Sequence, residues 1–146
     1  MRLFTIGFTQ KPAERFFNLL RERQVRQLVD IRLNPDGQLS GFAKRADLPY
    51  FLDRLVGCTY RHVPSLAPTS DILAAYRSDR NWDRYVERFE ALMDQRDVPA
   101  SIDRDVFETH VTCLLCSEHQ PERCHRRLVA ERVARAWTDV EIVHLG

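Results

Sequence analysis

The chain of 146 residues has the length of one domain, and its 44% hydrophobic and 29% charged residues are typical of an ordinary soluble protein. Its 22 basic residues nearly balance its 21 acidic ones, so a net charge of +1 argues against a general nucleic-acid coat but leaves a local basic patch open. No apolar run approaches the ~18 residues of a membrane span, and no targeting signal is visible. We therefore expect a cytoplasmic protein without a membrane partner, in which the four unevenly spaced cysteines stay reduced. The oligomeric state is left open.

Hydrophobic periodicity predicts strands that alternate with helices along the chain. The expected strands cover residues 2–6, 27–31, 58–63, 110–116 and 140–145. The first expected helix begins at Pro12, and the others cover residues 48–56, 71–77, 82–95 and 121–137. Residues 97–108 are ambiguous. Because the strands are apolar on both faces, we predict a single α/β domain over residues 1–146, with three layers and a mostly parallel sheet that carries helices on both faces.

Two local features add to this outline. Asp47 is predicted to cap the second helix through its side chain. Residues 33–46 form a polar loop that is longer than most loops in a compact domain, which indicates a lid or a binding loop. Phe42, Lys44 and Arg45 in this loop are either solvated or contacts to a phosphate and a base.

Unusual residues stand at three predicted strand ends. They are Gly7 with Thr9, Asp30 with Arg32, and Cys116 with Glu118. In parallel sheets, ligands bind outside the carboxyl ends of the strands. We therefore expect these residues to meet at one edge, where they would line a site.

The densest group of reactive residue types follows the fourth predicted strand. Cys124, His125 and Arg126 lie within the helix expected from Pro121, and extending the apolar stripe of that helix back by one turn reaches His125 and Arg126. Both side chains are therefore expected on the sheet-facing side near a helix N-terminus, where backbone N–H groups and positive partial charge favour an anion. This arrangement predicts an anion cradle.

Three segments of the chain resemble the signatures of the domain of unknown function 488 (DUF488) family. They are Thr5-Ile6-Gly7-Phe8-Thr9, then Leu28-Val29-Asp30-Ile31-Arg32 with Pro35, and finally Leu114-Leu115-Cys116-Ser117-Glu118 with Pro121, Cys124, His125 and Arg126. The last block, Cys-x-Glu…Pro-x-x-Cys-His-Arg, is the specific one. Phe8 and Thr9 depart from the family, whose members read His-Ser there, so no role for that histidine carries over. The resemblance implies an α/β domain and supplies no established activity.

Our leading hypothesis is a small enzyme with a pocket for an anionic ligand, such as a nucleotide, a nucleic-acid fragment or another phosphorylated compound. The candidate catalytic residues are Asp30, Cys116, Glu118 and His125, and the candidate ligand-binding residues are Gly7, Thr9, Arg32 and Arg126. Asp30, as a buried carboxylate, is also expected to pair with Arg32 or Arg126.

Two alternatives remain open. The first is a non-catalytic anion- or zinc-binding regulatory module, in which Cys116, Cys124 and His125 would hold the metal. Cys113 is not expected to join them, because residues three apart on a strand face opposite ways. The second is thiol-dependent phosphoryl or sulfur transfer, or redox chemistry, at Cys116. Against a phosphatase, Glu122 stands where such enzymes carry arginine. The stripe from Trp82 to Met93 is interpreted as a core face, and the cofactor is unknown.

Overall fold

A five-stranded sheet organises the chain. A computed structural model describes residues 1–146, apart from the side chains of residues 38–40. The strands are β1 (Arg2–Gly7), β2 (Gln27–Asp30), β3 (Thr59–His62), β4 (Thr112–Cys116) and β5 (Glu141–Leu145). They lie in the order β3-β2-β4-β1-β5, and every neighbouring pair runs parallel. The predicted parallel α/β architecture is confirmed.

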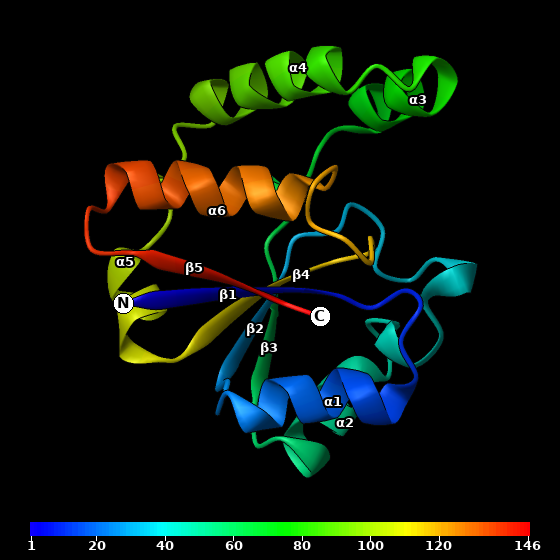
Figure 1. Ribbon diagram of the computed structural model, residues 1–146, viewed down its shortest axis with the longest axis vertical. Helices are drawn as coiled ribbons and strands as arrows, with labels where there is room; N and C mark the ends of the chain where they lie inside the picture. Colours follow the sequence, from blue (N-terminus) through cyan, green and yellow to red (C-terminus); the bar gives the residue numbers. More distant parts are fainter.

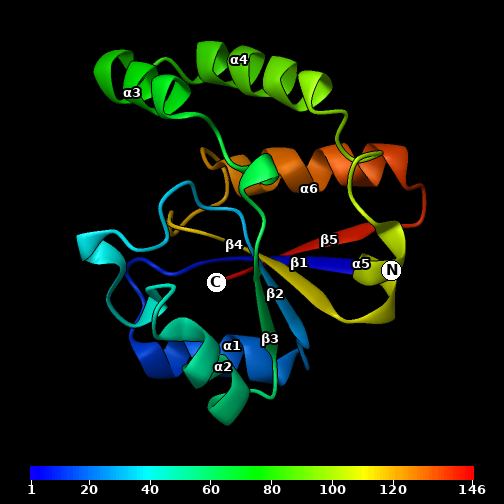
Figure 2. The ribbon, with the colours of Figure 1, turned by 180° about the vertical axis from the view of Figure 1, so that it is seen from behind.

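Helices cover both faces of this sheet (Figures 1 and 2). They are α1 (Ala13–Glu22), α2 (Leu48–Leu55), α3 (Ser70–Asp79), α4 (Trp82–Gln95), α5 (Arg104–Thr109) and α6 (His125–Ala136). α1 and α2 lie on one face, which we call the α1/α2 face. α6, with the α3–α4 hairpin beyond it, lies on the other, which we call the α4/α6 face. α5 lies close to the N-terminus of the chain and leads into β4.

The position of β4 creates a switch point in the sheet. β4 lies between β2 and β1, although it follows β3 in the chain. The chain leaves β1 and β2 toward helices on the α1/α2 face, whereas it leaves β4 toward α6 on the opposite face. Connections that diverge in this way open a crevice at the carboxyl ends of the strands, where ligands bind. Cys116, the last residue of β4, lies at this point.

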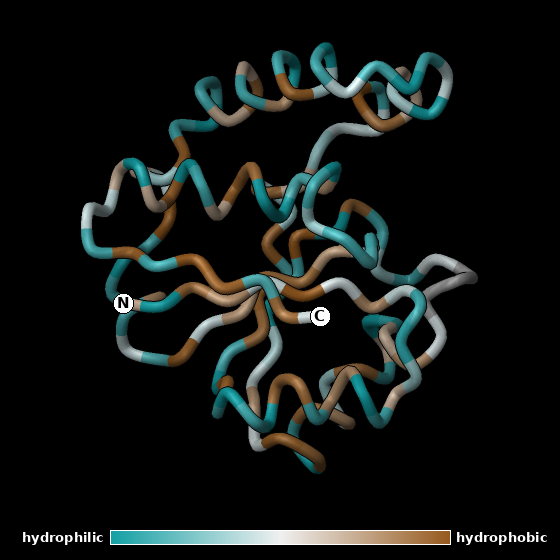
Figure 3. The backbone as a smooth tube through the Cα atoms, in the orientation of Figure 1, coloured by the Kyte–Doolittle hydropathy of each residue, from teal (hydrophilic) through white to brown (hydrophobic). Residues whose placement is uncertain are grey.

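Alternate residues of β4 pack into different layers. Leu114 and Cys116 belong to the buried cluster on the α4/α6 face, whereas Cys113 and Leu115 belong to the cluster on the α1/α2 face. This is the period of two that an extended strand imposes, and it confirms that Cys113 and Cys116 point to opposite faces. Hydrophobic residues accordingly gather along the central strands, with hydrophilic ones on the outer helical turns (Figure 3).

Three details at helix starts differ from the sequence-based expectation. α6 begins at His125 rather than Pro121, because the Cys124 backbone is extended and its N–H donates to the Pro121 carbonyl at 3.2 Å within the preceding turn. Asp47 precedes α2, but its side chain makes no capping hydrogen bond, since its backbone dihedral angles are helical rather than extended. Pro12 is the N-cap of α1 rather than its first helical residue.

The remaining boundaries follow the sequence pattern closely. α4 occupies the predicted range, and α5 forms within the ambiguous residues 97–108 and the residue after them. The predicted loop 33–46 contains a short 3₁₀ helix, η1 (Gln38–Ala43), although three side chains of that loop lie outside the described residues. None of the described helices has the length and apolarity that a membrane span requires.

Candidate functional site

A pocket of about 350 Å³ opens at the carboxyl end of β4. Five of the nine residues expected at this edge line it: Arg32, Cys116, Glu118, Cys124 and His125. The other four, Gly7, Thr9, Asp30 and Arg126, lie beside it and are not among its described lining residues. The expected site is therefore a pocket with two supporting clusters, rather than one continuous ring of side chains.

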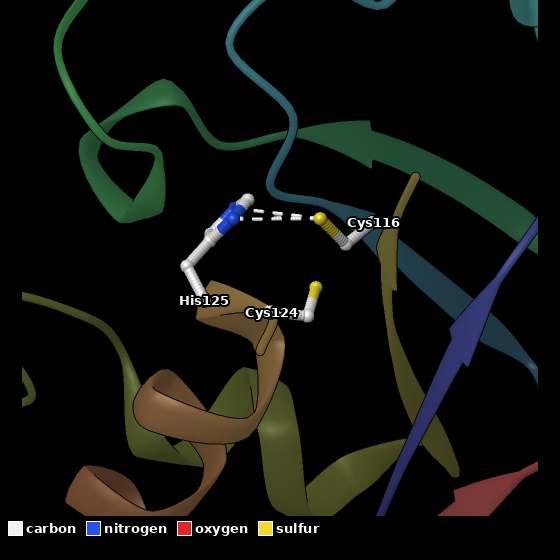
Figure 4. Close-up of side chains that lie close together, drawn as sticks. All are labelled: Cys116, Cys124 and His125. Carbon is white, nitrogen blue, oxygen red and sulfur yellow. Dashed lines mark hydrogen bonds between the residues drawn. The ribbon is translucent and has the colours of Figure 1, made fainter. Parts of the chain in front are cut away.

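Two cysteines and a histidine converge at this pocket. Cys116 ends β4, Cys124 stands at the N-cap position of α6, and His125 is the first residue of that helix. Their side chains point toward one another (Figure 4), and their sulfur and nitrogen atoms all lie within 4.8 Å of one another. Cys116 Sγ lies 3.4 Å from His125 Nδ1. All three residues are buried, so these contacts are formed largely out of water.

The His125 ring is oriented by the backbone carbonyl of Ile31, the residue that follows β2. Its Nε2 lies 2.7 Å from the carbonyl oxygen of Ile31. A carbonyl oxygen can only accept, so Nε2 carries the hydrogen and Nδ1 of the neutral ring is left as an acceptor. Phe89 also packs against the ring, with centroids 5.7 Å apart. Nδ1, the ring nitrogen nearer to Cys116 Sγ, is thus oriented to accept the thiol proton.

The environment of Cys116 favours its thiolate. Burial alone would raise the pKa of this thiol, but the Cys124 thiol and the backbone N–H groups of Ser117 and Glu118 donate to its sulfur, and the Arg126 charge lies nearby. Together these contacts bring the pKa of Cys116 below its ordinary value of 9.0. Burial and the hydrogen bond to Cys116 raise the pKa of Cys124 well above the usual range. The surroundings therefore shift the pKa values of the two thiols in opposite directions.

A buried arginine fixes the loop that follows β4. Arg126 is completely buried, its Nη1 donates to the carbonyl of Glu118, its Nη2 to that of His119 at 3.3 Å, and its Nε to Thr5 Oγ1 at 3.2 Å. Thr9 Oγ1 donates to the Ser117 carbonyl at 2.7 Å on the same loop. The donors of Arg126 thus bind protein atoms around the loop instead of facing the pocket.

Gly7 allows this loop to cross β1 closely. A Cβ atom at position 7 would overlap the Glu118 carbonyl oxygen and lie 2.6 Å from Arg126 Nη1. The first strand-end motif therefore serves close packing of backbone and guanidinium, which explains why glycine is required at this position.

The second supporting cluster surrounds Asp30. Arg32 donates to both carboxylate oxygens of the buried Asp30, at 2.8 and 2.7 Å, which confirms the expected pairing. Tyr60 donates to the same carboxylate at 2.5 Å. The Arg32 guanidinium also lies over the Phe8 ring, 5.2 Å from its centroid, and donates to the Ala43 carbonyl. Among the described atoms only Arg32 Nη1 lacks a partner in this cluster. Asp30 thus holds Arg32 in place.

Within the residues that it describes, the structure does not show the contacts expected of Phe42 and Glu118. Phe42 packs against Phe16 and Phe17, with ring centroids 5.2 and 5.6 Å apart, so it belongs to the α1/α2 core and is not available to stack on a base. Glu118 is exposed and lines the pocket, but no hydrogen bond joins its carboxylate to His125 among the described residues. The acid/base pair of Glu118 and His125 remains a prediction.

Sequence reasoning missed one wall of the pocket. Tyr76 of α3 and Trp82 and Tyr85 of α4 line it, together with the exposed guanidinium-bearing residues Arg77 and Arg123. The helical periodicity of α4 correctly assigned Tyr85 to the core, where it is buried. Periodicity describes a face of a helix and carries no information about which end of that face borders a cavity.

Comparison with known proteins identifies the family of the chain. No curated protein and no solved structure matches the chain. The family described as "Domain of unknown function DUF488" matches residues 12–133, a range that includes Asp30, Cys116 and the start of α6. Since this range covers most of the sequence, the chain belongs to the DUF488 family.

Proposed function

We propose that the protein is a small enzyme that acts on an anionic ligand in this pocket, with Cys116 as the reacting group. The observation that carries the proposal is the position of Cys116 Sγ, at the switch point of the sheet and 3.4 Å from an oriented imidazole nitrogen. Cysteine nucleophiles are activated by such a base together with N–H donors that stabilise the thiolate.

The anion would be held by the exposed arginines of the pocket. Arg77 on α3 and Arg123, in the turn before α6, line it from different elements. The fork of donors on a guanidinium matches the oxygens of phosphate and carboxylate groups. Arg126 and the Asp30–Arg32 pair act as positioning residues, since they hold the loop after β4 and the end of β2.

The chemistry follows from these positions. His125 Nδ1 takes the proton of the Cys116 thiol, and the thiolate donates an electron pair to the electrophilic atom of the ligand while the bond to its leaving group breaks. The leaving group departs with that bonding pair and the proton from His125. Water then displaces the Cys116 sulfur, and His125 returns one proton of that water to the thiol. The net reaction is hydrolysis of the ligand, with Cys116 and His125 regenerated.

Two alkylating probes that differ in charge test the proposal without a known substrate. Iodoacetate is an anion, and iodoacetamide is its neutral analogue. We expect the ratio of their rates at Cys116 to exceed the ratio for glutathione by about tenfold, because the arginines concentrate the anion near the thiolate. Intact mass and peptide mapping give the rates. Inorganic phosphate should compete with iodoacetate.

Matched variants locate the effect. Arg123→Ala should bring the ratio toward that of glutathione, whereas Arg21→Ala, at an exposed arginine of α1 on the opposite face, should leave it unchanged. Cys116→Ser should remove the reaction at this site. A ratio equal to that of glutathione in the wild-type protein would overturn the anion-pocket part of the proposal.

A metal centre is the second candidate function. Cys116, Cys124 and His125 offer three ligand atoms within 4.8 Å, and the Ile31 carbonyl binds the other ring nitrogen of His125, as outer partners do for metal-bound histidines. Two cysteines and one histidine suit zinc with a fourth position open. Glu118 would then be a further ligand or a base. Near-stoichiometric zinc in elemental analysis of the reduced protein would replace the thiolate mechanism, whereas metal-free protein with the rate ratio above would exclude this candidate.

A further inference from the structure

The pocket has an aromatic wall that the proposed chemistry does not use. Trp82 stacks on Tyr85, with centroids 5.0 Å apart and planes at 14°, and Tyr76 meets Trp82 edge-on at 5.7 Å. Tyr85 continues the stack onto Phe89 at 6.0 Å and 7°, and Phe89 contacts the ring of His125. These ring contacts continue from α3 and α4 to His125. Trp82 and Tyr76 at its outer end are only half-buried.

Cationic groups stand beside this wall. Arg77 directly follows Tyr76 on α3, and Arg123 approaches from the turn before α6. Both side chains are exposed and line the same pocket as the aromatic residues. In the described part of the chain, neither guanidinium takes part in a salt bridge. The pocket therefore offers aromatic ring surface and positive charge without an ion-pair partner to one ligand.

We infer that the ligand is a nucleoside 5′-monophosphate, with its base on the Tyr76–Trp82 wall and its phosphate at Arg77 and Arg123. This inference rests on the proposed function and names its substrate class. Aromatic side chains bind bases by stacking, and arginines bind phosphate by charge-assisted hydrogen bonds. A volume of about 350 Å³ lies near the lower end of small-ligand sites, so it suits one nucleotide rather than a dinucleotide. The terminal nucleotide of a nucleic acid presents the same chemistry.

Tryptophan fluorescence and calorimetry test this assignment. AMP should quench Trp82 saturably, while Trp137, packed against Phe107 at 5.6 Å outside the pocket, gives a constant background. Ribose 5-phosphate and adenosine, which each lack one of the two groups recognised, should bind at least tenfold more weakly than AMP. A 5′-phosphorylated pentanucleotide that binds more tightly than AMP would assign the site to nucleic-acid ends, and equal or weaker binding would assign it to the free nucleotide.

Variants of the wall separate stacking from charge. Trp82→Ala should weaken AMP binding about tenfold to hundredfold, because stacking is worth about 1–3 kcal/mol per base, and should leave ribose 5-phosphate unaffected. Trp82→Phe keeps a stacking ring and should retain most of the affinity. Circular dichroism of both variants checks the fold.

The failure of this inference is distinguishable from failure of the proposed function. If Trp82→Ala leaves AMP affinity unchanged, or if ribose 5-phosphate binds as tightly as AMP, the aromatic wall does not hold a base and the inference is overturned. A preserved preference of Cys116 for iodoacetate would then keep the proposed function. If AMP does not bind and that preference is also absent, both are overturned.

Discussion

The two faces of the sheet share the same five strands, yet their interiors differ in kind. On the α1/α2 face, rings from α1 and from the loop after β2 fill the layer: Phe16 and Phe17 lie 5.1 Å apart, and both contact Phe42. On the α4/α6 face, the apolar cluster ends at the carboxyl edge in a pocket with Cys116 and His125. The first interior is closed by packing, and the second ends in an open pocket.

The difference shows how one strand can serve both purposes. Cys113 and Cys116 are three residues apart on β4, and both are buried. Burial raises the pKa of Cys113 well above the usual range, since nothing nearby compensates for its desolvation to a similar extent. Cys116 meets backbone N–H groups, a thiol and the charge of Arg126, so its pKa is lowered instead. Residue type is therefore a poor guide to reactivity, and the surroundings set it.

The largest expected effect on stability comes from a cavity in the packed core of the α1/α2 face. Phe16 is fully buried, so Phe16→Ala should lower the free energy of unfolding by about 3–5 kcal/mol through lost burial and an unfilled cavity. Urea denaturation followed by circular dichroism measures the change. Tyr50→Ala, at a residue that is 61% exposed, is the matched control and should cost far less. Equal losses for the two variants would contradict the assignment of Phe16 to a tightly packed core.

A smaller loss is expected where the loop after β4 crosses β1. Gly7→Ala places a methyl group against the Glu118 carbonyl and Arg126, and such overpacking should cost about 1–3 kcal/mol. The same substitution at Gly146, where no atom lies within 4 Å of the added group, should leave stability unchanged. Chemical denaturation of both variants compares them. If Gly7→Ala is as stable as the wild type, the close crossing does not exist.

The smallest expected effect concerns the pH dependence of Cys116 alkylation and the influence of Cys124 on it. Iodoacetamide should alkylate Cys116 with a midpoint below pH 9.0, because a lowered pKa means that the thiolate forms at lower pH. Cys124→Ala removes one donor to that thiolate, so the midpoint should move up and the rate at pH 7 should fall several-fold, to about tenfold. Peptide mapping across pH values gives the profile.

The other cysteines serve as internal controls for this profile. Cys58, whose pKa burial raises to about 12, and Cys113 should stay unmodified in the folded protein at neutral pH. Cys113→Ala should not move the midpoint of Cys116, because its side chain packs on the opposite face of the sheet. A midpoint at or above pH 9.0 in the wild-type protein would argue that the contacts around Cys116 do not outweigh its burial.

Strand patterns and local motifs predicted much of the fold. Apolar runs located the buried strands β1, β2 and β4, because burial of a parallel strand on both faces requires largely apolar side chains. The edge strands β3 and β5 are partly exposed and carry polar side chains as well. Helix starts were less accurate: Pro121 is compatible with a first helical residue but instead lies in a turn, where the Cys124 amide binds its carbonyl. The residue at which α6 begins depends on the path of the loop after β4. The contacts of Arg126 and the close packing at Gly7 fix this path, rather than the local helix preference of the sequence.

The candidate site was predicted only in part. Strand-end chemistry identified Cys116, Glu118 and the start of α6, since parallel strands bring their carboxyl ends to one edge. Arg126 was expected to face a ligand, but its donors are directed to Thr5 and to two loop carbonyls. The direction of a long side chain depends on which polar groups surround it after folding, and these lie far apart in the sequence.

The sequence by itself determined the layer architecture, the opposite orientation of Cys113 and Cys116, and the need of Asp30 for an arginine partner, because periodicity and the cost of burying charge are local or nearly local constraints. Only the tertiary structure decided that His125 Nδ1 lies beside Cys116 and that an aromatic wall from the α3–α4 hairpin borders the pocket. Both depend on the packing of helices onto the sheet, which joins residues that no spacing along the chain relates.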